Sequence, residues 1–213
     1  MVAVIAIVIA ILGAFAGNAY INNEQNEKWY EIRMCRRTVM ICLISGTGVL
    51  LALLTYYFYN RSLIYMIQLL VLYEWLIPIA YVDWKKMIIP NKLIVAGMVL
   101  YALMLIYFIF GTDYRITDIL QYSLLGLALG FGVFILCMVL SRNSVGMGDV
   151  KLYSVLGLML GWKGVFCVLF FSVLALSVSG IYRLATGKAD KSTMIPLGPF
   201  TLIGMAISML LGV

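Results

Sequence analysis

The sequence contains no histidine, and only 11% of its 213 residues are charged. The missing histidine excludes Ser-His and Cys-His catalysis, together with the zinc motifs that depend on histidine. Of the four cysteines, Cys42, Cys137 and Cys167 lie inside apolar stretches and Cys35 lies in a polar one. No pair has the spacing of a metal site or a disulfide framework. We therefore expect no metal and no other cofactor, and we interpret the cysteines as packing residues.

The scarcity of charge also excludes a soluble globular protein. Hydrophobic residues make up 64% of the chain, more than a polar surface could cover in water. The lipid bilayer is therefore the expected solvent and the main non-protein partner. The net charge of +6 does not indicate nucleic-acid binding, because the basic residues are scattered through short polar segments and form no single patch.

Apolar windows between polar breaks predict eight membrane helices, one of them short. They cover 2–21, 38–58, 62–82, 92–110, 119–140, 149–161, 164–183 and 196–213. We expect an all-α polytopic protein with one membrane domain over 1–213. The weakest boundary is Gly161 to Gly164, which is either a turn between two crossings or an interruption in one long helix.

The first apolar segment raises the question of a cleaved signal peptide, because Ala14-Phe15-Ala16 resembles a small-residue cleavage site. A signal peptide begins with a positively charged region. No Lys or Arg precedes this segment, and the first charged residue is Glu24. We therefore expect 2–21 to be a retained first helix.

The distribution of positive charge predicts the orientation in the membrane. Twelve of the 15 Lys and Arg lie in or beside the first, third, fifth and seventh connections, whereas Arg61, Arg115 and Lys163 lie in the other three. Short loops rich in Lys and Arg stay in the cytoplasm. The odd-numbered connections are therefore expected to be cytoplasmic, with both termini outside.

The third connection reads Tyr81-Val-Asp-Trp-Lys-Lys-Met-Ile-Ile-Pro-Asn91, with Asp83 at its start. Taken alone, it is typical of a turn at the membrane interface. Trp and Lys are expected at the headgroups, and Pro is expected near the start of the next helix.

The fifth connection ends Ser144-Val-Gly-Met-Gly-Asp-Val-Lys-Leu152, with Asp149 opening the next helix. Taken alone, Asp149 could be a helix N-cap, and the glycines could be ordinary residues of a loop. Together with Asp83 it forms a pair of carboxyl groups at one membrane face. Two nearby carboxyl groups share a proton, so one can activate water while the other protonates a carbonyl oxygen. The pair predicts an aspartyl protease.

These two segments resemble the signatures of the type IV prepilin peptidases, which are GxGD aspartyl proteases. The matching residues are Asp83 to Lys86 with Ile89, Pro90 and Asn91, and Gly146 to Leu152; a third segment, Ile195 to Phe200, resembles the Pro-x-Gly-Pro element of the family. The resemblance implies a bacterial or archaeal-type cell-membrane endopeptidase that removes the short basic leader of pilin-like precursors at the cytoplasmic face.

The resemblance also implies a role for each matching residue. Asp83 and Asp149 would be catalytic, and nine further residues would shape the site: Gly146, Gly148, Lys86, Pro90, Asn91, Lys151, Pro196, Gly198 and Pro199. Larger family members carry a domain with paired CxxC motifs in the first cytoplasmic loop. Here 22–37 is a short loop with Cys35 alone, so we predict no zinc-binding insert and no N-methylation.

Glu74 is an acidic residue deep within an apolar span. Acidic groups inside a membrane are costly and are often functional, although a carboxyl group can also be neutralised within the bundle. Glu74 could tune the two aspartates. The alternative function is a small proton or cation transporter that uses Asp83, Asp149 and Glu74, although Asp83 and Asp149 lie at one face and away from the midplane where transport sites are found.

Overall fold

The computed structural model describes residues 2–24, 36–111, 115–140, 146–186 and 195–212, and all regular structure in these ranges is helical. The helices are α1 (Val2–Glu24), α2 (Arg36–Phe58), α3 (Leu63–Lys86), α4 (Asn91–Gly111), α5 (Ile116–Leu140), α6 (Met147–Ala185) and α7 (Gly198–Leu210). Six are long and apolar enough to cross a membrane, and α7 is a shorter apolar helix. The predicted all-α polytopic architecture is confirmed.

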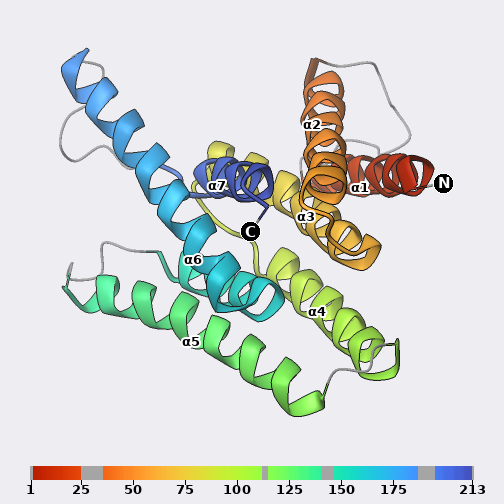
Figure 1. The fold of residues 1–213 in the computed structure, drawn as a ribbon. Coiled ribbons are helices and arrows are strands. Elements are labelled where there is room, and N and C mark those ends of the chain that lie inside the picture. The colour runs from red at the N-terminus through yellow and green to blue at the C-terminus, as the bar shows by residue number, and fades with distance from the viewer. Residues whose placement is uncertain (1, 25–35, 112–114, 141–145, 187–194, 213) are drawn as a thin grey trace.

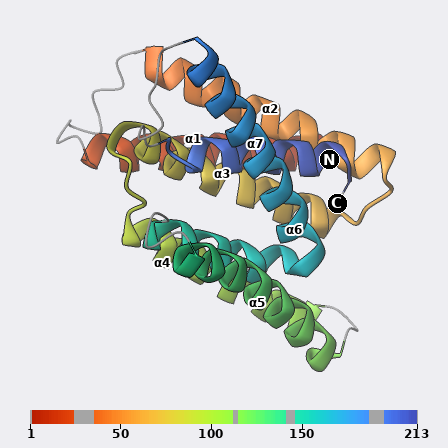
Figure 2. The ribbon, with the colours of Figure 1, turned by 90° about the vertical axis from the view of Figure 1, so that its left-hand side faces the viewer.

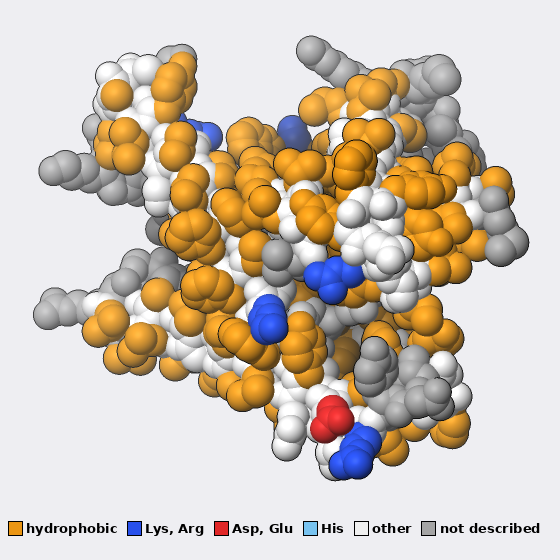
Figure 3. All heavy atoms as spheres, viewed as in Figure 1, with side chains coloured by type: hydrophobic (Ala, Val, Ile, Leu, Met, Phe, Trp, Pro, Cys, Tyr) orange, Lys and Arg blue, Asp and Glu red, His pale blue; other side chains and the backbone are white. Residues whose placement is uncertain are grey.

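Helix α3 is the centre of the bundle. Two thirds of its most apolar window, 67%, is buried, against 17–28% for the other five long helices. It packs against α1, α2 and α7, with a smaller contact to α4 (Figures 1 and 2). The outer faces of the other helices carry exposed Leu, Ile, Val and Phe side chains, and hydrophobic side chains cover most of the surface in Figure 3. Such a surface suits contact with lipid.

Helix α6 is broken at Gly161, where φ is 67° and ψ is −177°. A Cβ at this position would lie 1.8 Å from Cε1 of Tyr122, so only glycine fits both the backbone and the space. Figure 2 shows α6 turning sharply between a first limb and a second limb that leads back. The break predicted at Gly161 to Gly164 is confirmed. The eight membrane crossings remain a prediction.

Both termini lie at the same end of the bundle in Figure 2, together with the α2–α3 connection and the bend of α6. The α3–α4 connection and the start of α6 lie at the opposite end. Successive connections thus alternate between the two ends of the bundle, as the order of the predicted spans requires. The outward orientation of the termini remains a prediction. The predicted first loop, 22–37, falls mainly on residues 25–35, which lie outside the described residues.

Two of the predicted helix boundaries that differ from the structure lie beside the paired aspartates. Asp83 was expected to open a loop, but α3 continues through Lys85 and Lys86 and ends at Met87, which has a left-handed φ of 54° and donates its N–H to the Asp83 carbonyl at 2.8 Å. Two lysines in the last turn favour this extension, because cations stabilise the negative end of a helix. Asp149 was expected to open its helix, but α6 begins at Met147 with Gly146 as N-cap.

The first limb of α6 packs closely on α5. A Cβ on Gly126 would lie 2.1 Å from the Gly157 carbonyl oxygen, and one on Gly130 would lie 2.2 Å from that of Tyr153. The backbones of the two helices are therefore in contact, as is common where small residues face each other in membrane proteins. This contact fixes the position of the helix that carries Asp149.

This contact predicts that Gly126→Ala destabilises the protein by about 1–3 kcal/mol, because the added methyl group forces two backbones apart. Gly132→Ala on the same helix is the control, since no atom lies within 4 Å of its would-be Cβ. It should leave stability unchanged or raise it by up to ~1 kcal/mol. Reversible unfolding in mixed micelles measures both variants. Equal stabilities of the Gly126→Ala and Gly132→Ala variants would show that the close α5–α6 contact is absent.

Candidate active site

Asp83 lies in the last turn of α3, and only 5% of the residue is exposed. Its Oδ2 atom accepts a hydrogen bond of 2.7 Å from the backbone N–H of Gly198, at the start of α7. A Cβ on Gly198 would lie 2.9 Å from the same oxygen and 3.0 Å from the Asp83 Cβ. Glycine is therefore needed for α7 to approach this carboxyl group so closely.

Asp149 lies in the first turn of α6, and its backbone N–H donates to the Gly146 carbonyl at 3.1 Å. Its side chain is partly exposed, in contrast to that of Asp83. The last turn of α3, which carries Asp83, and the first turn of α6, which carries Asp149, lie at the same end of the bundle (Figure 2). The fold thus brings together two acidic side chains that are far apart in the sequence.

The glycines of the second motif allow this approach. A Cβ on Gly146 would lie 3.2 Å from Oδ2 of Asp149, and one on Gly148 would lie 3.0 Å from the Cβ of Ile89. Gly148 therefore lets the start of α6 lie against the α3–α4 connection. Lys151 Nζ donates to Asn91 Oδ1 at 2.9 Å, which joins α6 to the first residue of α4.

The remaining predicted residues lie around these contacts. Pro90 directly precedes α4, and its carbonyl accepts from the N–H groups of Leu93 and Ile94. Lys86 is exposed at the end of α3. In the third motif, Pro196 is buried and Pro199 lies in the first turn of α7. All three sequence motifs therefore converge on one end of the bundle.

Tyr153 was not predicted as part of the site. It lies one turn beyond Asp149, is fully buried, and stacks on Phe134 with ring centroids 4.5 Å apart. Its hydroxyl lies 3.1 Å from Oγ1 of Thr201, which is one turn beyond Gly198. This hydrogen bond joins α6 to α7 about one helical turn beyond Asp149 and Gly198. The four-residue spacing places Tyr153 on the same helix face as Asp149, and this could have been noticed in the sequence. No sequence pattern indicated its partner on α7, Thr201.

Glu74 lies elsewhere. It is nine residues before Asp83 on α3, which corresponds to two and a half turns and so to the opposite face of the helix. Its Oε1 accepts from Ser45 Oγ on α2 at 2.7 Å, and a Cβ on Gly13 of α1 would lie 2.8 Å from its side chain. Its Oε2 has no hydrogen-bond partner among the residues that the structure describes. None of these contacts links Glu74 to the aspartates.

The chemistry open to this site is that of paired carboxyl groups. No group of three or more Cys, Asp or Glu side chains that could hold a metal ion occurs among the described residues. Asp83 and Asp149 can act as a general acid and a general base, because like charges held together favour a state in which one group keeps its proton.

The fold and the site together define a polytopic helical membrane protein with a buried and a partly exposed aspartate at one end of its bundle. The profile of the type IV leader peptidase family matches residues 70–181. The chain belongs to this family. The match contains both aspartates and ends before α7.

Several curated relatives bear the name prepilin leader peptidase/N-methyltransferase. The Bacillus subtilis protein is 30% identical over 137 residues, which are 64% of this chain and 52% of the relative. The Myxococcus xanthus protein is 33% identical over 134 residues, 60% of this chain and 38% of the relative. The Stutzerimonas stutzeri protein is 29% identical over 138 residues, 64% of this chain and 47% of the relative. The matches thus span about half the length of these relatives, and no solved structure matches the chain significantly.

The hydrogen bond between Tyr153 and Thr201 predicts energetic coupling between α6 and α7. Tyr153→Phe keeps the stacked ring and should lower the free energy of unfolding by about 1 kcal/mol. In a double-mutant cycle with Thr201→Val, the coupling should be about 0.5–1.5 kcal/mol.

Tyr73→Phe is the matched control, because Tyr73 makes the same 3.1 Å contact with Thr47, between α3 and α2. It should show no coupling to Thr201→Val. Additive effects of Tyr153→Phe and Thr201→Val would contradict the proposed link.

Proposed function

We propose that this protein is a membrane-embedded aspartyl endopeptidase that removes the short basic leader of type IV pilin-like precursors. Asp83 and Asp149 form its catalytic pair. The proposal needs no cofactor, because two carboxyl groups and a water molecule suffice for hydrolysis of a peptide bond.

One observation carries this proposal: the last turn of α3, with Asp83, and the first turn of α6, with Asp149, lie at the same end of the bundle, each within a family motif (Figure 2). The Gly198 N–H adds a hydrogen bond to Asp83 Oδ2. Family membership and the names of the relatives support the same reaction class.

In the proposed mechanism the pair holds one proton. The ionised carboxylate accepts a proton from the attacking water, while the protonated one donates to the carbonyl oxygen of the scissile bond. The Gly198 N–H keeps Asp83 oriented through both states, because Oδ2 can accept this bond whether or not the carboxyl group is ionised. Asp149 is more exposed than Asp83, so the substrate would approach the pair from the side of Asp149.

We place the reaction at the cytoplasmic face of the cell membrane. The connections that carry most of the Lys and Arg are those predicted to be cytoplasmic, and the two aspartates lie beside the third and fifth of them. A precursor would present its leader there while its apolar segment lies in the bilayer. Lys151 is hydrogen-bonded to Asn91. This contact gives the lysine a structural role, which explains its presence near a basic leader.

Two further activities receive no support. Residues 22–37 contain Cys35 alone, so N-methylation is not extended from the relatives' names to this chain. The transporter alternative required Glu74 to act with the aspartates. Its contacts with Ser45 and Gly13, on the opposite face of α3, favour a role in packing α1 and α2.

The catalytic pair predicts that Asp83→Asn and Asp149→Asn each lower the cleavage rate by roughly 10³ or more, because either loss leaves the reaction without its acid or its base. The measurement is the mass loss of a candidate pilin precursor in proteoliposomes, and the product mass also reports any methyl group. Asp118→Asn makes the same chemical change on α5, away from the pair, and should cleave normally. Undiminished cleavage by either of the first two variants would refute the pair.

The close approach of Gly198 predicts that Gly198→Ala slows cleavage at least about tenfold, since a displaced catalytic group loses alignment. The added methyl group would meet Asp83 Oδ2 at 2.9 Å. Gly46→Ala is the control, because no atom lies within 4 Å of that would-be Cβ. Equal cleavage rates of Gly198→Ala and the wild type would show that α7 does not position Asp83.

A further inference from the structure

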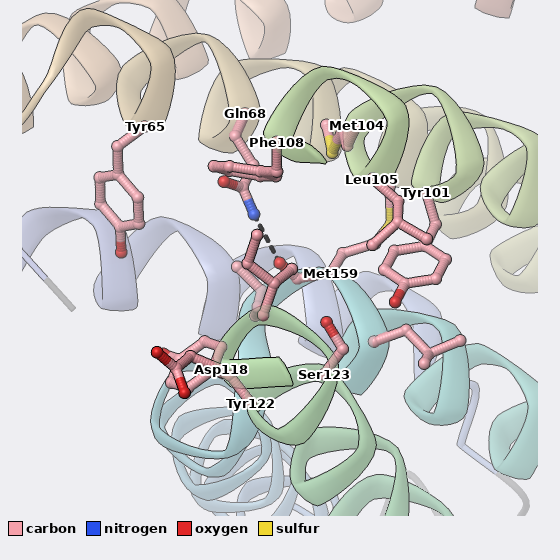
Figure 4. Close-up of a pocket in the computed structure, with 13 residues that line it drawn as sticks. Tyr65, Gln68, Tyr101, Met104, Leu105, Phe108, Asp118, Tyr122, Ser123 and Met159 are labelled. Carbon is pink, nitrogen blue, oxygen red and sulfur yellow. Dashed lines mark hydrogen bonds between the residues drawn. The ribbon is translucent and has the colours of Figure 1, made fainter. Parts of the chain in front are cut away.

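A second candidate site lies at the other end of the bundle. A cavity of about 470 Å³ opens between α3, α4, α5 and the bend of α6 (Figure 4). Its volume is in the range of sites for small organic ligands. Tyr65 lines it, and Asp83 lies 18 residues further along α3, a distance of about 27 Å on a helix. The cavity is therefore separate from the paired aspartates.

The interior of the cavity is apolar except for a few isolated polar groups. Met104, Leu105 and Phe108 of α4 line it. Ser123 is only 5% exposed, and its hydroxyl has no hydrogen-bond partner among the described residues. In Figure 4 this hydroxyl points into the space between the surrounding side chains. The hydroxyl oxygen is open to the cavity and not sealed inside the protein, so it can donate to a ligand acceptor there.

Ser123 lacks the backbone hydrogen bond that several helical serines of this protein make. Serines in a helix commonly donate to the carbonyl four residues earlier. Ser154, Ser172 and Ser177 all make this bond, at 2.5–2.7 Å. Ser123 does not, although it too lies inside a helix. Gln68 adds a second open group, because its Nε2 donates to the Met159 carbonyl while Oε1 has no described partner.

Charges of both signs flank one end of the cavity. Asp118 and Tyr122 line it and are exposed. The Arg61 guanidinium lies 5.3 Å from the centroid of the ring of Tyr65, which lines the cavity. One Arg61 nitrogen donates to the Gly212 carbonyl, which leaves further donors on the guanidinium. In Figure 4, Asp118 lies beside Tyr122, away from Tyr101 and Leu105.

We propose that this cavity binds a phospholipid with a zwitterionic headgroup. The ammonium group pairs with Asp118, the phosphate pairs with Arg61, and one acyl chain fills the apolar interior. Ser123 is five residues beyond Asp118 on α5, about 7.5 Å along the helix, so its hydroxyl meets the ester region of the same lipid. A purely anionic headgroup would meet the Asp118 carboxylate, which disfavours it.

A lipid is the appropriate class of occupant because the surrounding helix surfaces are those that face the bilayer. Leu103, Ile106 and Phe110 of α4 are all more than half exposed. In a membrane these side chains contact lipid tails. An acyl chain that enters between α4 and α5 therefore moves from the apolar bilayer into an apolar cavity. The headgroup of the same lipid gains two charged partners, Asp118 and Arg61.

Native mass spectrometry of the purified protein in mixed micelles tests this proposal. The probes are phosphatidylethanolamine and phosphatidylglycerol with the same acyl chains. The wild type should retain one phosphatidylethanolamine with a preference of about fivefold, the scale of an exposed ion pair. Equal retention of the two lipids, or no retained lipid, would overturn the proposal.

Variants separate the parts of the site. Asp118→Asn should remove the preference between the lipids, and Arg61→Gln should weaken binding of both. Ser123→Leu should fill the interior and abolish retention, whereas Ser177→Leu, an exposed position on α6, should not. Because Ser123 is buried, the exposed Asp118 and Arg61 variants keep the test valid if Ser123→Leu fails to fold. A preference unchanged by Asp118→Asn would overturn the assignment of the ammonium group.

Discussion

The hydrogen bond from the Gly198 N–H to Asp83 is the interaction on which the arrangement of the site depends. The first N–H groups of a helix have no partner within the helix. At the start of α7 one of these donors is directed at the Asp83 carboxyl group, 2.7 Å away. Both groups would be unfavourable alone in an apolar surrounding. Their pairing satisfies a helix end and a buried acid together, and it joins the last described helix to the central one.

The absence of a side chain at three glycines makes this convergence possible. Gly198 admits α7 to Asp83, Gly148 admits α6 to Ile89, and Gly126 admits α5 to Gly157. Each contact is too close for a Cβ without displacement of its neighbour. The position of Asp149 therefore depends on α5, which holds the first limb of α6, and on the α3–α4 connection, which the start of that limb touches.

The sequence predicted the helices well because long apolar windows and their polar breaks determine where a chain can cross a membrane. It also located the break at Gly161 and the two aspartates. It placed Asp83 in a loop, however, because a charged residue was treated as the end of an apolar span. In fact Lys85 and Lys86 extend the helix by stabilising its last turn.

The contacts between helices were beyond prediction from the sequence. In a soluble protein, hydrophobic periodicity distinguishes the buried face of a helix from the exposed one. In a membrane the lipid-facing side chains are as apolar as the core. Nothing in the sequence therefore indicated that Tyr153 would meet Thr201, or that an open cavity would lie beside Ser123.

The two faces of α3 divide the molecule into a half that holds the paired aspartates and a half that holds Glu74. The face that carries Asp83 meets α7, and through it α6 and Asp149. The opposite face carries Glu74 and meets α1 and α2. The family match begins within α3 at residue 70, so α1 and α2 lie outside it. Because Glu74 and Asp83 lie on the same helix, the packing of α1 and α2 helps to position the helix that carries Asp83.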